Sequence, residues 1–586
     1  MRVPFLETTQ SGFQWVADRV WKVEHAFERH NAASQQAQST RMRIFAITVG
    51  LGVGYLALAV FAGKASLFNS PGQMAEMAGE PNARAQLIDR NGELLASDVN
   101  DYDVFVDPTD MTVPDRAYVR EALQRIFPQA TTDQLDKVFA AQGPSRLTGN
   151  ISEADRERIL NYGLPGITFG AHRVRDYPLA TTGAVYIGMT QRGGQGLSGA
   201  EKAFNGAITA QAIHDQPVQL AMDLRIQGAL ENEMRAQAEA EHAQGAVGII
   251  TNVRTGEVLA MASWPDFDLN HAGTYSEAQK RNHATADVYE VGSIFKVISL
   301  AIGLDTGAAT LNSVYDGRQP LQIGTRRIHD EHSSANLLTL TDVFIKSSNI
   351  GTSRVALDIG ADRMTKYYKA LNLFAPANTE LAGPAAPLLP GRWSDSSLVS
   401  SAFGQGMAIT PLSYAEAAGA ILNGGCLRPL TIRKYDPATP LPACTRVVQP
   451  STSAAMLELM RQNVLKGTGT RANAPGLRVG GKTGTAQKPV GGHYSDDDIS
   501  SFAAVFPVDG PVDGDRYLVQ ITFDSPQGTP DTNGSKQGGY VAAPVAGRII
   551  DRIAPFLGVE RKVDKFSGPQ WDKAAVAADD VTGDEH

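Results

Sequence analysis

The sequence predicts an α+β protein with an N-terminal transmembrane helix followed by two folded parts, of which the second is the larger. Three observations predict this organisation: one long uncharged apolar run, strand patterns at both ends of the block 220–560, and helical patterns between those strands. The chain has 586 residues, which is too long for one ordinary domain, and 42% of them are hydrophobic, enough to build a large core.

Residues 44–63 form the apolar run, and their length is about what a helix needs to cross a hydrocarbon core. The run is longer than the apolar part of a typical signal peptide, so we expect a retained, single-pass anchor. Arg41 and Arg43 stand at its N-terminal edge, whereas only Lys64 closely flanks the other end. This asymmetry predicts that the tail 1–43 stays in the cytoplasm and that everything beyond the anchor is exported.

The first folded part, residues 64–219, mixes short strand-like and helical pieces and is expected to be a modest α+β module. The second part, residues 220–560, has five strand signals: 245–250, 257–263, 478–487, 502–508 and 516–523. Helical patterns such as 340–357 and 412–422 lie between the early and late strands. These signals predict an antiparallel sheet of about five strands, flanked by helices. The acidic tail 561–586 is expected to be disordered.

The charge and the cysteines limit the possible functions. A formal net charge of -9 and a pI near 5.7, with no basic stripe, argue against a nucleic-acid binder. Cys426 and Cys444 are too few for a disulfide-built scaffold and lack the spacing of a zinc or redox motif. The sequence leaves open whether they form one disulfide or remain two buried thiols.

Ser293 and Lys296 are the first candidate catalytic pair. They are three residues apart at the start of an apolar run of helical character, so they are expected to share one helix face. A serine hydroxyl needs an adjacent base to become a nucleophile, and a partly desolvated lysine amine can serve. No other serine in the chain has a lysine three positions after it.

Ser347 and Asn349 are the second candidate pair, a hydroxyl for proton relay and an amide to hold a substrate carbonyl. The same Ser-x-Asn pattern occurs at Ser334 and Asn336, so the motif alone does not choose between the two. We favour Ser347 because its surroundings predict a helix over 341–358, whereas Ser334 lies in a polar segment typical of a loop.

Lys482, Thr483, Gly484 and Thr485 make the third candidate group, within a strand signal. An ammonium and hydroxyls there can bind a substrate carboxylate, and the glycine leaves room for a substrate backbone. Residues 476–483 also satisfy the phosphate-loop pattern, which requires a helix directly afterwards. The glycines and proline that follow disfavour such a helix, so we reject this alternative.

Ser-x-x-Lys, Ser-x-Asn and Lys-Thr-Gly in this order form a signature of penicillin-binding proteins and serine β-lactamases. The chain resembles the class B penicillin-binding proteins over about residues 84–550. Further segments that carry the resemblance are 84–92 (RAQLIDRNG), 177–178 (YP), 199–202 (GAEK), 255–262 (TGEVLAMA), 404–406 (GQG), 410–411 (TP) and 538–545 (GGYVAAPV). The chain departs at Val291, where such proteins commonly have proline.

The resemblance implies a fold and a reaction. Residues 64–219 would be an elongated pedestal, or dimerisation-like, domain, and residues 220–560 a transpeptidase domain of the penicillin-binding and serine β-lactamase type. Ser293 would attack the D-alanyl-D-alanine end of a peptidoglycan stem peptide and form an acyl-enzyme, which an amine of a neighbouring stem peptide resolves. Lys296 would be the general base, and β-lactams would acylate the same serine.

The remaining roles also follow from the resemblance. Ser347 would pass a proton to the leaving amine, Asn349 would hold the substrate amide, and Lys482 would bind the substrate carboxylate with Thr483 and Thr485. The oxyanion donors would be the backbone N–H groups of Ser293 and Thr485. No metal or cofactor is expected.

The resemblance further places the protein in the inner membrane, with its catalytic domain in the periplasm. Expected partners are stem peptides and lipid-linked glycan strands, β-lactams, a polytopic glycan polymerase and other division proteins in the membrane. The length and the lack of an appended C-terminal domain favour the division-specific enzyme of septal wall synthesis. The alternatives are the elongation-specific class B enzyme, a β-lactamase or carboxypeptidase, and a non-catalytic wall-binding sensor of the same fold.

Overall fold

The computed structural model describes Thr48, Val49 and Gly52, and residues 83–562 apart from 192–193, 332–335 and 492. The expected cytoplasmic tail 1–43, most of the predicted anchor 44–63 and all but two residues of the expected acidic tail 561–586 lie outside the described residues. Within the described parts of the chain, no helix is both long enough and apolar enough to span a membrane. The chain divides into two compact units, Met1–Glu80 and Pro81–His586, and the second is described below.

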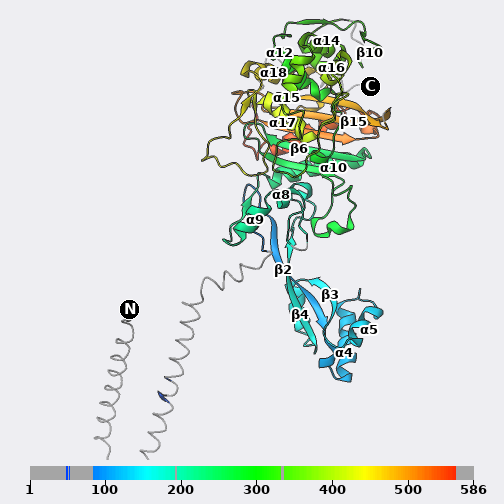
Figure 1. The fold of residues 1–586 in the computed structure, drawn as a ribbon, viewed down its shortest axis with the longest axis vertical. Coiled ribbons are helices and arrows are strands. Elements are labelled where there is room, and N and C mark those ends of the chain that lie inside the picture. Colours follow the sequence, from blue (N-terminus) through cyan, green and yellow to red (C-terminus); the bar gives the residue numbers. More distant parts are fainter. Residues whose placement is uncertain are drawn as a thin grey trace, which may run out of the picture. The chain divides into compact units, whose positions relative to one another are not determined.

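The first sheet is built around one long strand, β2 (Leu94–Val106). Its antiparallel neighbours are β1 (Leu87–Ile88), β3 (Ser145–Ile151) and β4 (Ile167–Asp176), and β1 also pairs in parallel with β5 (Val218–Gln219). Three helices, α4 (Val113–Ile126), α5 (Thr132–Ala140) and α6 (Glu153–Leu160), share a small apolar core with this sheet (Figure 1). Thr112 and Thr131 each begin a helix through a capping box, which explains where α4 and α5 start.

Three short helices follow the first sheet, α7 (Ala184–Ile187), α8 (Gly199–Ala203) and α9 (Asn205–Ala212), and a buried ion-pair network joins the sheet to α8. The fully buried carboxylate of Glu201 in α8 forms ion pairs with Arg84 and with Arg175 of β4, whose Nε lies 2.7 Å from it. Arg175 also contacts Asp98 of β2 at 3.0 Å. Buried charges of this kind are tolerated only when each has its partner, so the three elements are fixed together.

The second sheet has five strands in the order β14-β15-β16-β6-β7, and every neighbouring pair is antiparallel. The strands are β14 (Gly480–Val490), β15 (His493–Phe506), β16 (Tyr517–Asp524), β6 (Gly245–Asn252) and β7 (Val258–Trp264). The expectation of a five-stranded antiparallel sheet that joins both ends of the block is therefore confirmed. Strand β15 begins nine residues before its predicted start at Phe502, because its polar first half pairs with β14 without being fully buried.

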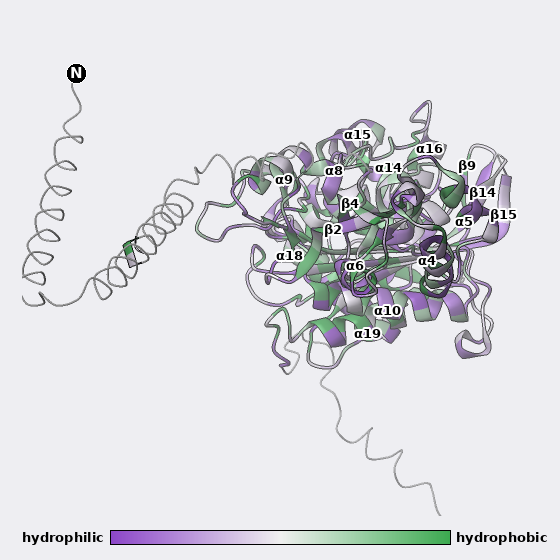
Figure 2. Cartoon of the chain, turned by 90° about the horizontal axis from the view of Figure 1, so that it is seen from below, coloured by the Kyte–Doolittle hydropathy of each residue, from purple (hydrophilic) through white to green (hydrophobic). Residues whose placement is uncertain are grey.

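Both faces of this sheet are covered. On one face pack α10 (Leu224–Ala240) and α19 (Ala542–Ile553), in both of which hydrophobic and hydrophilic residues alternate along the helix (Figure 2). On the other face lies a larger helical layer, whose members include α12 (Lys296–Asp305), α17 (Pro411–Leu422) and α18 (Pro450–Lys466) (Figure 1). In β16, Leu518 belongs to one core whereas Val519 and Ile521 belong to the other. Strands buried on two faces have continuous apolar sequences, which is why this sheet can be predicted readily.

The helical layer also contains α11 (His283–Ala286), α13 (Leu340–Ile345), α14 (Asn349–Ile359), α15 (Ala361–Ala370) and α16 (Asp395–Ala402). Two short antiparallel strand pairs border it, β8 (Val314–Asp316) with β11 (Leu337–Thr339), and β9 (Leu321–Ile323) with β10 (Arg326–Ile328). A third pair, β12 (Cys426–Leu427) with β13 (Thr445–Arg446), follows α17.

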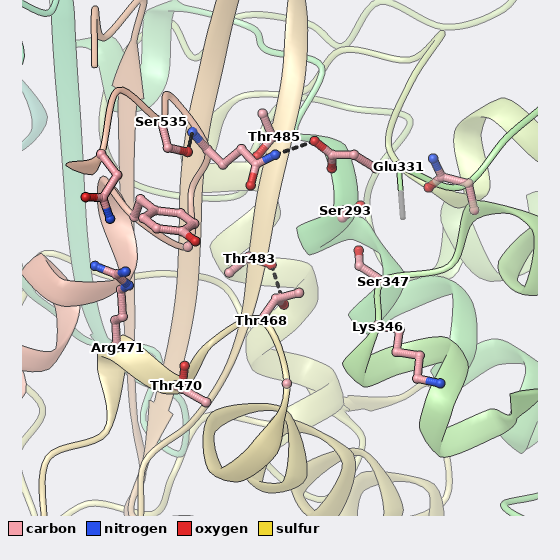
Figure 3. Close-up of a pocket in the computed structure, with 16 residues that line it drawn as sticks. Ser293, Glu331, Lys346, Ser347, Thr468, Thr470, Arg471, Thr483, Thr485 and Ser535 are labelled. Atoms are coloured by element: carbon pink, nitrogen blue, oxygen red, sulfur yellow. Dashed lines mark hydrogen bonds between the residues drawn. The ribbon is translucent and has the colours of Figure 1, made fainter. Parts of the chain in front are cut away.

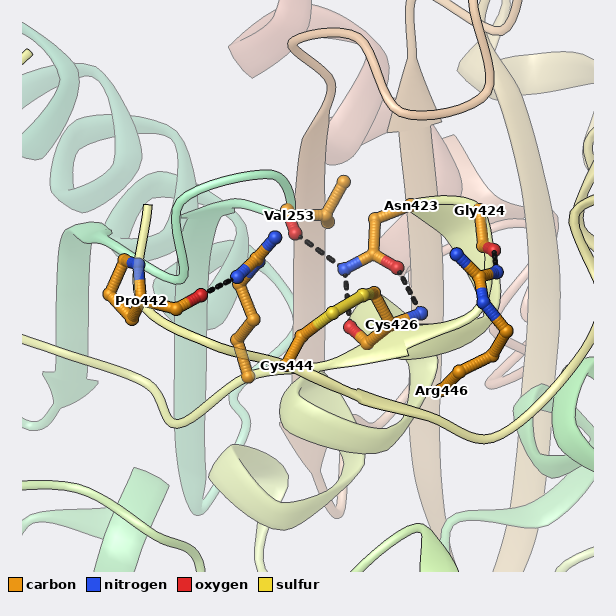
Figure 4. The surroundings of a disulfide bond; sticks show 8 residues. Val253, Asn423, Gly424, Cys426, Pro442, Cys444 and Arg446 are labelled. Carbon is orange, nitrogen blue, oxygen red and sulfur yellow. Dashed lines mark hydrogen bonds between the residues drawn. A yellow bond between two sulfur atoms is a disulfide. The ribbon is translucent and has the colours of Figure 1, made fainter. Parts of the chain in front are cut away.

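Cys426 and Cys444 are joined by a disulfide between β12 and β13, which resolves the alternative that the sequence left open (Figure 4). Their Cα atoms are 5.4 Å apart, an ordinary separation for a bridge. Asn423 holds Cys426 in place, since its side chain accepts from the backbone N–H of Cys426 at 2.8 Å and donates to the carbonyl at 2.7 Å.

The loop closed by this disulfide bonds to two other parts of the chain. Thr431 accepts a backbone hydrogen bond from Val258 of β7 and donates one to Gly256, both at 2.9 Å. The carbonyl of Ile432 accepts from Ala221, directly after β5, at 2.8 Å. The loop therefore connects the end of the first sheet with the edge strand of the second.

Candidate active site

Ser293 lies in a single 3₁₀ turn, Gly292–Phe295, which leads directly into α12 at Lys296. Ser293 is half-buried and lines a cavity of about 450 Å³ (Figure 3), whereas Lys296 is fully buried. The predicted helix start is thus present, in the tighter form in which residues three apart nearly eclipse.

Backbone contacts hold the turn that carries Ser293 from two sides. Gly292 has a φ of 59° and donates its N–H to the carbonyl of Gly404 at 3.0 Å. On the other side, a Cβ on Gly484 of β14 would come within 2.8 Å of the Val291 carbonyl. The 3₁₀ turn that carries Ser293 therefore occupies the space beside Gly484. The expectation that this glycine leaves room for a substrate backbone is wrong.

Lys296 makes three hydrogen bonds with the Ser-x-Asn segment. Its Nζ donates to the Ser347 carbonyl at 2.6 Å, to the Asn349 Oδ1 at 2.7 Å and to the Ser347 Oγ at 3.2 Å. Burial lowers the pKa of Lys296 to about 7, although the carboxylates of Asp330 and Glu331 oppose this shift. The neutral amine, which can accept a proton, is therefore accessible near neutral pH.

Lys482 reaches the same hydroxyl from β14. Its Nζ donates to the Ser347 Oγ at 2.9 Å and to the Thr483 carbonyl at 3.0 Å. Burial lowers the pKa of Lys482 well below its usual value, and the charge of Lys296 lowers it further. The three candidate motifs, far apart in the sequence, thus meet around one oxygen atom.

Thr483 and Thr485 complete the cavity wall contributed by β14 (Figure 3). The Thr483 hydroxyl is 2.7 Å from that of Thr468, and the Thr485 hydroxyl accepts from the N–H of Gly538 at 3.1 Å. Since Lys482 and Thr483 lie within a strand and no helix follows them directly, the phosphate-loop alternative lacks its required context.

The expectation that Ser347 lies within a helix over 341–358 is wrong. Helix α13 ends at Ile345, α14 begins at Asn349, and Ser347 between them has a φ of 57°. The N–H of Ser348 bonds to the Val343 carbonyl and that of Ser347 to the Phe344 carbonyl, the Schellman pattern of a helix end. Glycine normally occupies this left-handed position, which costs other residues about 1–2 kcal/mol. A serine there gives no sequence signal that the helix ends.

The rival Ser334 lies outside the described residues, and Asn336 is exposed. Sequence reasoning also missed Asp330, which lies in the polar segment expected to be a solvated loop. Its carboxylate accepts from the Ser348 hydroxyl at 2.6 Å and from the Ile350 N–H at 2.9 Å. Asp330 therefore fixes the N-terminus of α14 and, with it, the turn that carries Ser347.

Asn463 and Thr468 were also missed. Asn463 is fully buried near the end of α18, where its side chain donates to the Gly481 carbonyl at 2.8 Å and accepts from the Thr468 N–H at 3.1 Å. Thr468 in turn contacts the Thr483 hydroxyl. This chain of bonds orients a hydroxyl on β14, and only the folded structure reveals it because its members are separated along the sequence.

Among the described residues, no cluster of histidine, cysteine, aspartate or glutamate side chains fits a metal ion. What the site offers is a half-buried serine, two buried lysines with lowered pKa values, and hydroxyls and amides around them. This combination suits acyl transfer through a serine ester.

Comparisons with known proteins agree with this chemistry. The chain matches the penicillin binding protein transpeptidase domain over residues 246–551 and the penicillin-binding protein dimerisation domain over residues 80–207. It is 46% identical to the probable peptidoglycan D,D-transpeptidase FtsI of Caulobacter vibrioides over 560 residues, which cover 94% of this chain and 95% of the relative. It is 31% identical to the peptidoglycan D,D-transpeptidase FtsI of Escherichia coli strain K12 over 517 residues, or 82% of this chain and 84% of the relative. The probable peptidoglycan D,D-transpeptidase PenA of Neisseria gonorrhoeae is 29% identical over 510 residues, or 82% and 85%.

Proposed function

This chain belongs to the penicillin-binding protein transpeptidase family, and from that premise we propose that it is a peptidoglycan D,D-transpeptidase of septal wall synthesis. One structural observation carries the proposal beyond family membership. Two fully buried lysines, Lys296 and Lys482, converge on the Ser347 hydroxyl at the cavity that Ser293 lines. Such an arrangement can move a proton from a nucleophile to a leaving amine.

In the first half-reaction Ser293 attacks the carbonyl between the two terminal D-alanines, and its proton passes to neutral Lys296. The backbone N–H groups of Ser293 and Thr485 stabilise the oxyanion. Collapse of the tetrahedral intermediate breaks the peptide bond, and Ser347 relays a proton to the departing D-alanine. Lys482 donates hydrogen bonds to the terminal carboxylate at this end of the cavity, and the charge of that carboxylate raises the lowered pKa of the lysine.

In the second half-reaction an amine of a neighbouring stem peptide attacks the Ser293 ester. The ester bond breaks, the new amide is the cross-link, and the proton of the amine returns to the serine oxygen through Lys296. Asn349 and Thr483 hold the peptide chain and its carboxylate while acyl transfer takes place. A β-lactam forms the same ester, but the amine that its ring opening frees remains attached to the acyl group. This group therefore does not leave the site, and the enzyme stays blocked.

The cellular placement is part of the proposal. The uncharged run 44–63 and the basic residues before it support a single-pass anchor with the N-terminus in the cytoplasm. The disulfide supports a catalytic domain in the periplasm, because such bridges form in oxidising compartments. A polytopic glycan polymerase and other division proteins are the partners proposed for the anchor and the pedestal, and lipid-linked glycan strands supply the stem peptides.

Depletion of the protein in its own cell tests the septal role. Loss of septal cross-linking is expected to give filaments that fail to divide, whereas loss of an elongation-specific enzyme would give round cells. A purified full-length enzyme that cleaves penicillin rapidly and leaves no adduct would instead support the β-lactamase alternative.

Asp330→Asn is expected to shift the pH dependence of β-lactam acylation to lower pH. The Asp330 carboxylate raises the pKa of Lys296 against the effect of burial, so removing its charge lowers that pKa further. The weaker bonds to Ser348 and Ile350 are expected to cost about 1 kcal/mol of stability. Acylation rates between about pH 5 and 9 and thermal unfolding measure the two effects.

Asp342→Asn is the matched control, because Asp342 caps the neighbouring helix α13 through Thr339. It is expected to lower stability by a similar amount without moving the pH profile. A profile that moves equally in both variants would contradict the role given to Asp330.

A further inference from the structure

The cavity beside Ser293 contains one acidic side chain among the described residues that line it, Glu331 (Figure 3). Glu331 follows β10 and Asp330 and points toward the strand that carries Thr485. The reaction proposed above assigns no role to this carboxylate.

Glu331 has a neutral partner. The side-chain amide of Gln537, from the loop before α19, donates to the Glu331 Oε1 across the cavity. Within the described residues Glu331 makes no ion pair, and its side chain is exposed. An exposed carboxylate that is held only by an amide can exchange that amide for a cationic ligand at little cost.

The negative charge of Glu331 acts on its neighbours in the site. The Glu331 charge is felt by Lys296, whose pKa it raises, and by Asp498 of β15, whose pKa it raises as well. The other charged side chains among the described residues that line the cavity, Lys346 and Arg471, are cations, which repel an ammonium. A carboxylate at the rim is therefore the feature that makes entry of an ammonium favourable.

The substrates supply such a group. An acyl acceptor on a stem peptide is an amine, and free primary amines are protonated at neutral pH. Because donor and acceptor are stem peptides of the same wall, an uncross-linked donor carries the same amine. We propose that Glu331 binds the primary ammonium of a stem peptide at the rim of the Ser293 cavity. This inference rests on the proposed function, and it concerns a group of the substrate to which the three motifs do not bind.

The test uses full-length protein in detergent and the variant Glu331→Gln, which keeps an acceptor for Gln537 and removes the charge. The donor arm measures D-alanine release from a synthetic stem peptide that ends in D-alanyl-D-alanine and has its side-chain amine free or acetylated. The acceptor arm measures the KM of an amine-bearing peptide without that end, with the acetylated donor.

In the donor arm, the wild-type protein is expected to release D-alanine about fivefold faster from the free-amine donor than from the acetylated one. In the acceptor arm, its KM for the amine-bearing peptide is expected to be about fivefold lower than that of Glu331→Gln. Proof of either effect suffices, and fivefold is the upper end for an exposed ion pair. A preference confined to the donor arm identifies the donor ammonium as the ligand, and a change in KM alone identifies the acceptor. Either result supports the proposal.

Gln537→Ala is the matched control, because it removes the partner of Glu331 and leaves the charge. It is expected to retain the wild-type preference. Equal effects of both variants would mean that the Glu331–Gln537 bridge has a structural role, and an unchanged Glu331→Gln would mean that no ammonium binds there; both overturn the inference. Failure of wild-type protein to form a penicillin adduct at Ser293 would overturn the proposed function instead.

Discussion

Replacing Ser293 by alanine is expected to abolish covalent labelling by a β-lactam and to lower cross-linking by at least about a thousandfold. The expected loss is this large because no other hydroxyl lies in the 3₁₀ turn that β14 and Gly404 hold in place. Mass spectrometry of the intact full-length protein is the direct measurement. The wild-type chain should gain the mass of one opened β-lactam, and its digest should place that mass on the peptide containing Ser293.

Ser535→Ala is the control, since Ser535 lines the same cavity from the loop before α19. This variant should keep the adduct and fold as the wild type does. An adduct of undiminished yield on the Ser293→Ala protein would remove the nucleophile assignment, and with it the reaction proposed here.

Lys296→Met is expected to slow acylation by about a hundred- to ten thousandfold, the usual contribution of a general base. The wild-type rate should rise with pH through the pKa of Lys296, about 7, because only the neutral amine accepts the serine proton. Methionine fills the same buried space without an amine, so the remaining slow rate should lose this rise. Stopped-flow acylation by a chromogenic β-lactam between about pH 5.5 and 8.5 measures both effects.

The same substitution should stabilise the protein at neutral pH. The unfolded chain binds a proton at this lysine up to the ordinary lysine pKa of 10.5, whereas the folded chain releases it near 7, so burial of the amine lowers stability below about pH 10. Lys346→Met is a suitable comparison, because Lys346 lines the cavity but is half exposed. If Lys346→Met slowed acylation as much as Lys296→Met, or if the Lys296→Met rate still rose through pH 7, Lys296 would not be the base.

The strands of the second sheet could be predicted because their side chains are apolar on both faces, as in Phe502 to Phe506. The first half of β15 could not, since residues such as Tyr494 pair with β14 through the backbone while their side chains face solvent. Hydrophobic periodicity in a sequence indicates which residues are buried. It therefore does not predict strand segments that are hydrogen-bonded but exposed.

The candidate site shows a similar division. Ser293, Lys296 and Lys482 could be found because their motifs keep a fixed spacing within one turn or one strand. Asp330 could not, because its importance lies in two hydrogen bonds to a helix that begins 19 residues later. The reason for favouring Ser347 is one that the structure contradicts, since a strained turn, and not a helix, presents its hydroxyl to both lysines.

The disulfide-closed loop between Cys426 and Cys444 bears on how the enzyme matures after synthesis. It bonds both to Ala221, at the exit of the first sheet, and to the edge of the second, and a covalent bridge closes it. In an exported chain, the disulfide between Cys426 and Cys444 forms only after translocation, when the two thiols meet an oxidant. With the periplasmic placement proposed above, maturation includes an oxidation step after synthesis, and newly translocated molecules lack the covalent closure of this loop between the two sheets until it has taken place.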